Sequence, residues 1–423
     1  MPAQPLGKHV LATGFAVLLG GLAAGIVGAA MTWLLLRIQA LTYGVESASL
    51  LAEVRAASDV RRVLGPLIGG LLAGLGWWWL RGRGPVTTVE AALEVTAPRA
   101  LPLRRTLADA VLQILVVGSG ASIGREGAPR QAAAAMTQAI AGRLAIPDPR
   151  QRTLVACAAG AGLAAVYNVP VAGAVFAVEV LRTPRRWGTV ACAAAMSAVA
   201  TVTAWPVVTN RPTYDFPAIA ADPAMVAWSF AWALTSVPVV ALTGRAFTAL
   251  AGRARRHAVA PRVTLPLAVG ASSALVGLAA VALPALPALP GNGKDILQLT
   301  FSAEGTLPLF LILLVLKPLA TALCLRSGAV GGLLTPALAT GAALGGAVAL
   351  AVHPLAAAAP LPVFALLAAA GVLAVTQRAP LFAVTMTWEL THAPIWTIPL
   401  LCLTAYGAHW AYKGCSARLH GGS

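Results

Sequence analysis

Long runs of apolar residues are the feature that most constrains how this chain can fold. The first run covers residues 10–40 and contains a single charged residue, Arg37. Because about 20 helical residues cross the hydrocarbon core of a bilayer, a run of this length predicts a tilted transmembrane helix. A membrane β-barrel would instead show short segments of alternating hydrophobicity. The chain is therefore predicted to be an all-α, polytopic membrane protein.

The composition supports this prediction. Of the 423 residues, 58% are hydrophobic and only 10% are charged, whereas soluble domains carry about 25% charged residues. The 41 glycines and 30 prolines suit transmembrane helices that pack closely and break often. The net charge of +16 comes without a run of basic residues. We interpret it as positive-inside bias and an environment that favours anions, not as nucleic-acid binding.

The cysteines predict neither a disulfide framework nor a metal site. None of the five belongs to a CxxC pair, and the first four lie in apolar runs, where a thiol behaves as a small hydrophobe. They are Cys157, Cys192, Cys324, Cys402 and Cys415. We expect no cofactor.

Further apolar segments follow the first one along the chain. They are expected at 63–80, 106–117, 153–181, 187–208, 223–250, 265–281, 307–325, 333–352, 363–390 and 394–410. Residues 42–62 are predicted to form a loop outside the hydrocarbon, and residues 85–94 a short helix that begins at Pro85. Lys317, inside an apolar segment, is expected to face the protein interior or to extend towards the interface.

The stretch 118–129, with the sequence GSGASIGREGAP, is the centre of the chain. Its four glycines allow sharp turns and bring backbone amides close to a ligand. The residues that follow, 131–141, favour a helix, and the N-terminus of a helix attracts anions. Arg125 and Glu126 lie side by side in this stretch. An ionisable residue within a membrane is a candidate functional residue, because its burial is costly.

An internal repeat relates two interrupted segments. Leu163, Ala164, Pro170 and Glu179 recur 210 residues later as Leu373, Ala374, Pro380 and Glu389. Each proline should break its helix, and repeated broken helices are typical of transport folds with a site near the membrane midplane. The repeat predicts two half-repeats, 1–222 and 223–412. Residues 413–423 are expected to be a short tail, with no C-terminal cytoplasmic domain.

Three motifs resemble those of the chloride channel (CLC) family of anion channels and proton-coupled anion exchangers. Gly124-Arg125-Glu126-Gly127 resembles the GREGP or GKEGP motif, the loop 328–336 resembles GxxxGGxFxP, and residues 168–173 resemble NAPLAG. The resemblance covers nearly the whole membrane part. It implies an inverted-repeat helical fold, a homodimer with one anion pathway per subunit, and Glu126 as the external gating glutamate.

The same resemblance suggests which groups bind the anion. Dehydrated anions need donors, and backbone amides at helix ends supply them without trapping the ion. The candidate anion-binding residues are Gly124, Arg125, Gly127, Gly84, Leu333 and Leu334.

The chain departs from the family pattern at the inner site. The serine of the family's GSGxP motif is missing: Gly84 occupies its place or, with a one-residue deletion, Arg83 does. The family's late tyrosine has Cys415 as its nearest counterpart. Without these two hydroxyls we expect backbone amides to dominate the inner site and selectivity there to be loose.

Another departure concerns proton coupling. Exchangers of the family usually carry an inner glutamate, and here that position is Val180. Glu179 precedes it but should face elsewhere on an α-helix. We therefore expect a voltage- or pH-gated anion channel, or a leaky uncoupled transporter, with Glu126 as the gate. A proton-coupled chloride exchanger remains the alternative.

Other functions are less compatible with the sequence. An intramembrane enzyme with Ser119 as nucleophile would need a histidine or an acidic partner in the membrane, so we expect no enzyme. A cation transporter would need more intramembrane acids. The expected partners are a second copy of the chain, anions and the bilayer, but no nucleic acid. The expected location is the inner or cell membrane of a bacterial-type cell.

Overall fold

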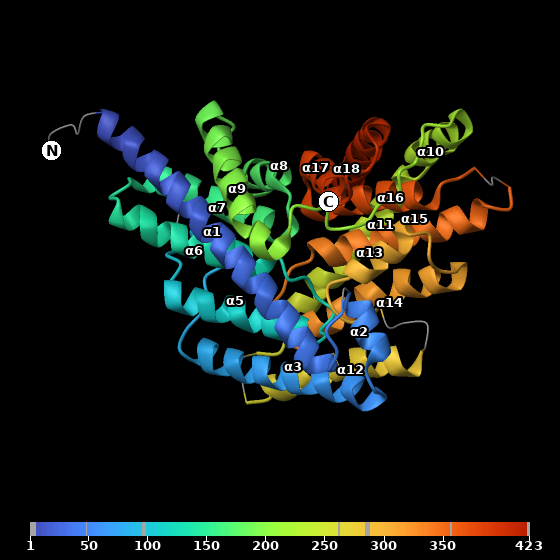
Figure 1. The fold of residues 1–423 in the computed structure, drawn as a ribbon, viewed down its shortest axis with the longest axis horizontal. Coiled ribbons are helices and arrows are strands. Elements are labelled where there is room, and N and C mark those ends of the chain that lie inside the picture. Colours follow the sequence, from blue (N-terminus) through green and yellow to red (C-terminus); the bar gives the residue numbers. More distant parts are fainter. Residues whose placement is uncertain are drawn as a thin grey trace. The chain divides into compact units, whose positions relative to one another are not determined.

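The structure is a computed structural model. It describes residues 6–47, 49–94, 99–260, 263–283, 288–355 and 358–420, without the side chains of 6–10 and 415–420. Within these residues every extended regular element is a helix, as predicted (Figure 1). The elements are α1 (Leu6–Tyr43), α2 (Leu50–Ala56), α3 (Asp59–Gly82), α4 (Val89–Ala92), α5 (Leu103–Gly118), α6 (Gly127–Arg143), α7 (Asp148–Tyr167), α8 (Pro170–Val175), the π-helical turn η1 (Phe176–Val180), α9 (Trp187–Val208), α10 (Pro223–Thr235), α11 (Val237–Arg256), α12 (Leu265–Ala282), α13 (Lys294–Phe301), α14 (Leu307–Arg326), α15 (Leu334–Val352), α16 (Leu361–Gln377), α17 (Pro380–Thr391), the 3₁₀ turn η2 (Ile395–Thr397) and α18 (Ile398–His420).

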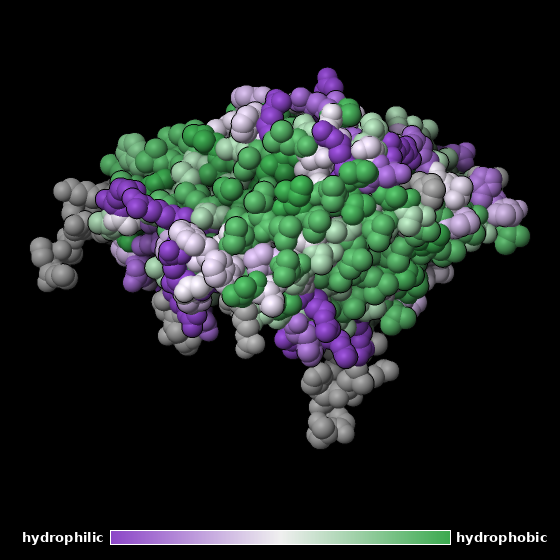
Figure 2. Space-filling view, turned by 90° about the horizontal axis from the view of Figure 1, so that it is seen from below, coloured by the Kyte–Doolittle hydropathy of each residue, from purple (hydrophilic) through white to green (hydrophobic). Residues whose placement is uncertain are grey.

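The helices confirm that the chain is a multi-pass integral membrane protein. In the described residues six helices are long and apolar enough to cross a membrane, or seven if the bent pair α10 and α11 forms one span. Large apolar side chains on these helices are exposed, for example Phe15, Leu267 and Val315. On the face shown in Figure 2, hydrophobic residues cover most of the surface and hydrophilic residues gather towards its margins. Such an extended apolar surface suits contact with lipid.

The chain forms two compact units that interleave in the sequence. The first contains Met1–Leu34, Trp79–Ile114 and Glu126–Pro212, and the second contains Leu35–Trp78, Leu115–Arg125 and Thr213–Ser423, within the described residues. The division of the chain into two half-repeats, 1–222 and 223–412, stays a prediction from the sequence.

Small residues hold the helices of the first unit close together. α7 packs against α6, α8 and α9. A Cβ atom added at Gly162 of α7 would lie 2.5 Å from the carbonyl oxygen of Pro129 on α6. Only glycine permits this approach of two backbones, which explains why the segments are rich in glycine and alanine.

The internal repeat is visible in the backbone. Asn168 follows α7 and Arg378 follows α16 as C-cap residues, both with left-handed φ values, 56° and 55°. In each case a proline two residues later opens the next helix. Residues with left-handed φ values also follow the helical segments that these prolines open: Arg182 lies after η1 and His392 after α17. Each pair is separated by 210 residues, so the predicted helix breaks and the repeat are confirmed.

Two predictions of local structure were wrong between α1 and α5. Residues 42–62 contain α2, whose first turn is capped by the Ser49 hydroxyl through the Ala52 N–H, and α3 already begins at Asp59. Residues 85–94 are helical only in α4. That helix starts after Thr88, whose hydroxyl accepts the Ala91 N–H. Pro85 lies ahead of it, so the cap and not the proline fixes the start.

Two longer segments also differ from prediction. Residues 223–250 form α10 and α11, which meet at Ser236 with a bend of 52°. Pro238 accounts for the bend, because its ring removes an N–H and clashes with the preceding turn. The segment 153–181 ends in the π-helical turn η1, closed by the Leu181 N–H donating to the Phe176 carbonyl. Successive residues there are turned by less than in an α-helix, and such turns often occur at functional sites.

Candidate functional site

The two glycine-rich loops of the sequence meet in the second unit. Gly124 and Gly332 exchange a pair of backbone hydrogen bonds, each 2.8 Å long, in an antiparallel bridge. Gly331 lies directly against this bridge. A Cβ atom there would be 2.7 Å from Ile123 Cδ1 and 2.9 Å from the Gly124 carbonyl oxygen. The paired loops therefore hold the segment that ends at Arg125 beside the segment that leads to α15.

The N-terminus of α15 lies next to the second glycine-rich loop. Leu333, the residue before the helix, provides no side-chain cap, and the Leu334 side chain is buried at 2% exposure. The first turn of α15 carries the positive end of the helix dipole, which attracts anions. Leu333 and Leu334 as backbone ligands of an anion stay a prediction.

Positive charge gathers near the first loop. Burial, and next the charge of Arg125, lower the pKa of Lys294 at the start of α13. Arg125 and Lys294 are therefore close enough to repel each other. Two such cations raise the local concentration of anions. Arg125 was predicted from the sequence but Lys294 was not, because nothing in the sequence pattern relates a residue of α13 to this loop.

Lys317 of α14 anchors the same loop from inside the protein. Its side chain is fully buried, and its Nζ donates to Ser122 Oγ at 2.7 Å, to the Gly291 carbonyl at 2.7 Å and to the Leu289 carbonyl at 3.2 Å. Of the two predicted positions, the structure shows the interior one. A buried ammonium with three oxygen acceptors fixes the backbone around Ser122.

Substitution of this lysine is expected to destabilise the protein. Lys317→Met keeps the volume approximately but removes the ammonium donor from Ser122 Oγ and from the Gly291 carbonyl, whereas the Leu289 carbonyl still accepts the Ser122 hydroxyl. Each buried group left unsatisfied costs about 1–3 kcal/mol before relaxation. We expect a clear fall in the melting temperature of the purified protein, measured by tryptophan fluorescence. Lys413→Met on exposed surface of α18 is the control and should leave the melting temperature unchanged. Equal melting temperatures for the two variants would contradict this role for Lys317.

Glu126 lies in the first unit, immediately before α6. Its side chain is fully buried and does not cap the helix, although the residue is at the N-cap position. The Tyr167 hydroxyl donates to Glu126 Oε2 at 3.4 Å. Tyr167 is the last residue of α7, and the side chain of the next residue, Asn168, accepts from Trp205 Nε1 and donates to the Arg211 carbonyl. The helix break thus holds the tyrosine against the acid.

The predicted inner residues have different surroundings from those expected. Gly84 has a φ of +121°, and the Arg105 guanidinium donates to the carbonyls of Gly84 and Leu80. A side-chain cation, and not only backbone amides, therefore lies at the Gly84 turn. Arg83 stacks over the Trp79 ring at 3.9 Å from its centroid. The contact of Arg105 with Gly84 was not predicted, because Arg105 lies on α5, 21 residues later in the sequence.

The remaining inner-site candidates are less informative. Val180 ends the turn η1 and is half-buried. Cys415 belongs to α18, but its side chain lies outside the described residues. Neither position tests the prediction of loose selectivity.

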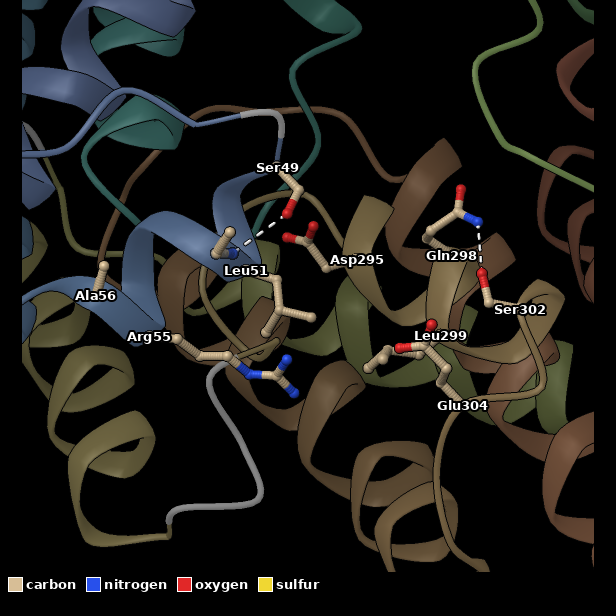
Figure 3. Close-up of a pocket in the computed structure, with 10 residues that line it drawn as sticks. Ser49, Leu51, Arg55, Ala56, Asp295, Gln298, Leu299, Ser302 and Glu304 are labelled. Atoms are coloured by element: carbon tan, nitrogen blue, oxygen red, sulfur yellow. Dashed lines mark hydrogen bonds between the residues drawn. The ribbon is translucent and has the colours of Figure 1, made fainter.

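A cavity of about 560 Å³ in the second unit lies between α2 and α13 (Figure 3). It is lined by Ser49, Leu51, Ala52, Arg55, Ala56, Asp295, Gln298, Leu299, Ser302 and Glu304. Asp295 accepts the Leu51 N–H, yet burial raises the pKa of its carboxyl above the ordinary value. Burial also raises the pKa of Glu53, which lies nearby on α2. No residue predicted for the anion site lines this cavity.

Comparison with known proteins decides the family. The sequence model of the voltage gated chloride channel family matches residues 69–412. The chain belongs to this family, the CLC family. The match includes every motif that carried the resemblance, from the Gly84 region through Glu126 to the start of α15.

Relatives with curated names support the membership. A ClcB-like protein of Ralstonia nicotianae, described as a chloride channel protein, is 32% identical over 381 residues, which are 84% of each chain. The voltage-gated ClC-type chloride channel ClcB of Escherichia coli is 28% identical over 333 residues, which are 77% of each chain.

Solved CLC structures have the same fold. A slow cyanobacterial Cl⁻/H⁺ antiporter matches with a TM-score of 0.80 and 21% identity, covering 98% of this chain and 95% of that one. A CLC-type fluoride/proton antiporter matches with a TM-score of 0.74 and 19% identity, covering 97% and 98%. At these identities the likeness shows the fold alone, and it confirms the predicted CLC-like architecture of broken helices.

Proposed function

We propose that this CLC protein carries chloride and similar anions across the membrane, as a channel whose gate is Glu126. The observation that supports this function best is the fully buried carboxyl of Glu126 at the start of α6, with no side-chain cap on that helix. A buried acid beside the positive end of a helix dipole lies where an anion would be stabilised. The printed names of the ClcB relatives agree with anion passage.

The carboxylate itself can act as the blocking anion. When ionised, it is attracted to the helix dipole and competes with the transported anion for the same donors. When protonated, it loses this attraction and can move aside. Anion flux should therefore rise as the pH falls and Glu126 becomes neutral. Arg125, covalently joined to Glu126, adds positive charge that draws anions to the same stretch of chain.

Val180 supports a channel over a coupled exchanger. A coupled exchanger must pass protons to the inner solution, and an apolar side chain cannot hold a proton. The relatives of higher identity are named as channels, whereas the structural neighbours are titled antiporters at 21% identity or less. Pairing of two copies and placement in a bacterial inner membrane follow from the family resemblance and belong to this proposal.

Anion efflux from liposomes tests the proposal. Purified protein is reconstituted with internal chloride, bromide, nitrate or glutamate, and efflux is started by adding a potassium ionophore. We expect rapid loss of the small anions and retention of glutamate. Liposomes that retain chloride at every pH between mildly acidic and mildly alkaline values would contradict anion transport by this chain.

The tyrosine beside the gate gives a more specific prediction. Tyr167→Phe removes the hydroxyl that donates to the Glu126 carboxylate and so destabilises the ionised, blocking form. A hydrogen bond worth about 1 kcal/mol corresponds to a shift of roughly 0.5–1 pH unit. We expect the midpoint of the pH dependence of chloride efflux to move to higher pH by this amount. Tyr406→Phe, at an exposed tyrosine, is the control. A midpoint that stays in place or moves to lower pH would exclude this role for Tyr167.

A further inference from the structure

Three exposed arginines lie at the ends of α11 and α14, in the second unit. Arg253 and Arg256 belong to the last turn of α11, and Arg326 is the last residue of α14. All three side chains are exposed. Arg253 and Arg256 are three residues apart and therefore lie on one face of their helix. We call these three residues the arginine patch.

A backbone hydrogen bond holds the two helix ends together. The Val259 N–H donates to the Arg326 carbonyl at 2.9 Å. Val259 follows Arg256 by three residues, which extend at most about 11 Å. The arginines of the two helices therefore lie on the same side of the second unit and close to one another.

The arginine patch lies where membrane-spanning helices end. Among the described helices that are long and apolar enough to cross a membrane, α14 ends at Arg326, and the bent pair α10 and α11 ends at Arg256. The end of a spanning helix lies at the depth of the lipid headgroups. The guanidiniums of the patch are therefore at the level of lipid phosphates.

No acid of the neighbouring helices neutralises this patch. Residues 223–293 and 305–388 contain neither aspartate nor glutamate. The helices α10, α14, α15, α16 and α18 pack against α11, and none of them contains an acid except outside these contacts. In the described part of the chain, the three guanidiniums form no ion pair and donate to no carbonyl. Arginines that cap a helix would donate to its last carbonyls, so the donors of the patch are available to a group outside the protein.

The chemistry of the patch selects a phosphate with net negative charge. A guanidinium presents five N–H donors in a planar fork that matches two oxygens of a phosphate. Basic pockets between transmembrane helices bind anionic headgroups in this way. A choline headgroup would bring a second cation next to the arginines and is therefore disfavoured.

We propose that the arginine patch binds the phosphate of an anionic phospholipid. The bound lipid bridges the ends of α11 and α14. This binding goes beyond the proposed anion transport and does not depend on it.

Native mass spectrometry of the purified protein tests the proposal without any flux measurement. The protein is freed of lipid in detergent and titrated with phosphatidylglycerol, phosphatidylcholine or glycerol 3-phosphate. We expect Arg253→Gln/Arg256→Gln/Arg326→Gln to weaken binding of the first phosphatidylglycerol by roughly a hundred-fold, since each arginine near an anionic headgroup contributes about a factor of five. Phosphatidylcholine should bind weakly to the parent and to the variant alike.

Two further variants separate the patch from general charge. Arg104→Gln/Arg143→Gln/Arg150→Gln removes the same charge from exposed arginines of the first unit and should bind phosphatidylglycerol as the parent does. Replacing the three patch residues by lysine retains the charge but removes the planar fork, so binding should be weaker than in the parent.

Each outcome decides the proposal. Equal binding of phosphatidylglycerol by the parent and the glutamine variant of the patch would overturn it. Equal loss of binding in the control variant would show a general charge effect and contradict a site at the patch. Glycerol 3-phosphate that binds as tightly as the lipid would identify a site for soluble phosphates instead. If the glutamine variant does not fold, the lysine variant decides, and binding as tight as in the parent then contradicts recognition by the guanidiniums.

Discussion

Replacement of Glu126 by glutamine is expected to remove most of the pH dependence of chloride efflux and to raise efflux at alkaline pH. Glutamine has nearly the same shape but cannot ionise, so it resembles the protonated, open gate at every pH. The attraction of a partly buried charge to a helix terminus is worth at most about 2 kcal/mol. The increase at alkaline pH should therefore be up to roughly thirty-fold. Efflux from liposomes at a series of pH values measures it.

The matched control is Glu94→Gln, because Glu94 is an exposed acid of the same unit. It should keep the parent pH profile. A Glu126→Gln profile that overlays the parent profile would remove Glu126 from the gating role and leave anion transport itself untouched.

Valine at Gly331 is expected to abolish or strongly reduce anion flux. Its Cβ atom would lie 2.9 Å from the Gly124 carbonyl oxygen and 2.7 Å from Ile123 Cδ1, closer than real contacts allow. The backbone must move, which separates Gly332 from Gly124 and displaces the loop that leads to α15. Overpacking of this kind costs about 1–3 kcal/mol, less than most folded proteins can lose. The variant should therefore fold yet transport poorly.

Gly252→Val in α11 is the control, since a Cβ atom there would touch only the flexible end of Arg256, at 3.6 Å. Size-exclusion chromatography establishes folding of both variants, and chloride efflux compares them. Parent-like efflux from folded Gly331→Val protein would show that the paired glycine loops do not shape the anion path.

Local rules predicted much of this fold. The breaks before Pro170 and Pro380 follow from proline chemistry, and their left-handed helix ends recur at the predicted spacing. A helix after the glycine-rich stretch was predicted over residues 131–141, and α6 begins four residues earlier, at Gly127. The bend of 52° at Ser236 was not predicted, because the apolar run continues on both sides of Pro238 and is long enough for a single helix.

Contacts between distant parts of the chain could not be predicted. The pairing of Gly124 with Gly332, the position of Lys294 near Arg125 and the guanidinium of Arg105 at Gly84 depend on tertiary packing. The bond from Tyr167 to Glu126 also joins residues 41 apart. Tyr167 could have been noticed as a polar residue at the end of an apolar helix, but its partner could not. Glu126 was thus predicted as a candidate from the sequence, but the side chains around it were not.

The reversal potential under a proton gradient tests the central claim most directly. Purified protein in a planar bilayer has equal chloride on both sides and a difference of about two pH units across the membrane. For a channel without proton coupling, the current should reverse near zero, because chloride alone sets the potential. A reversal potential that shifts with the proton gradient, or proton uptake driven by chloride efflux, would contradict the channel and establish the coupled exchanger.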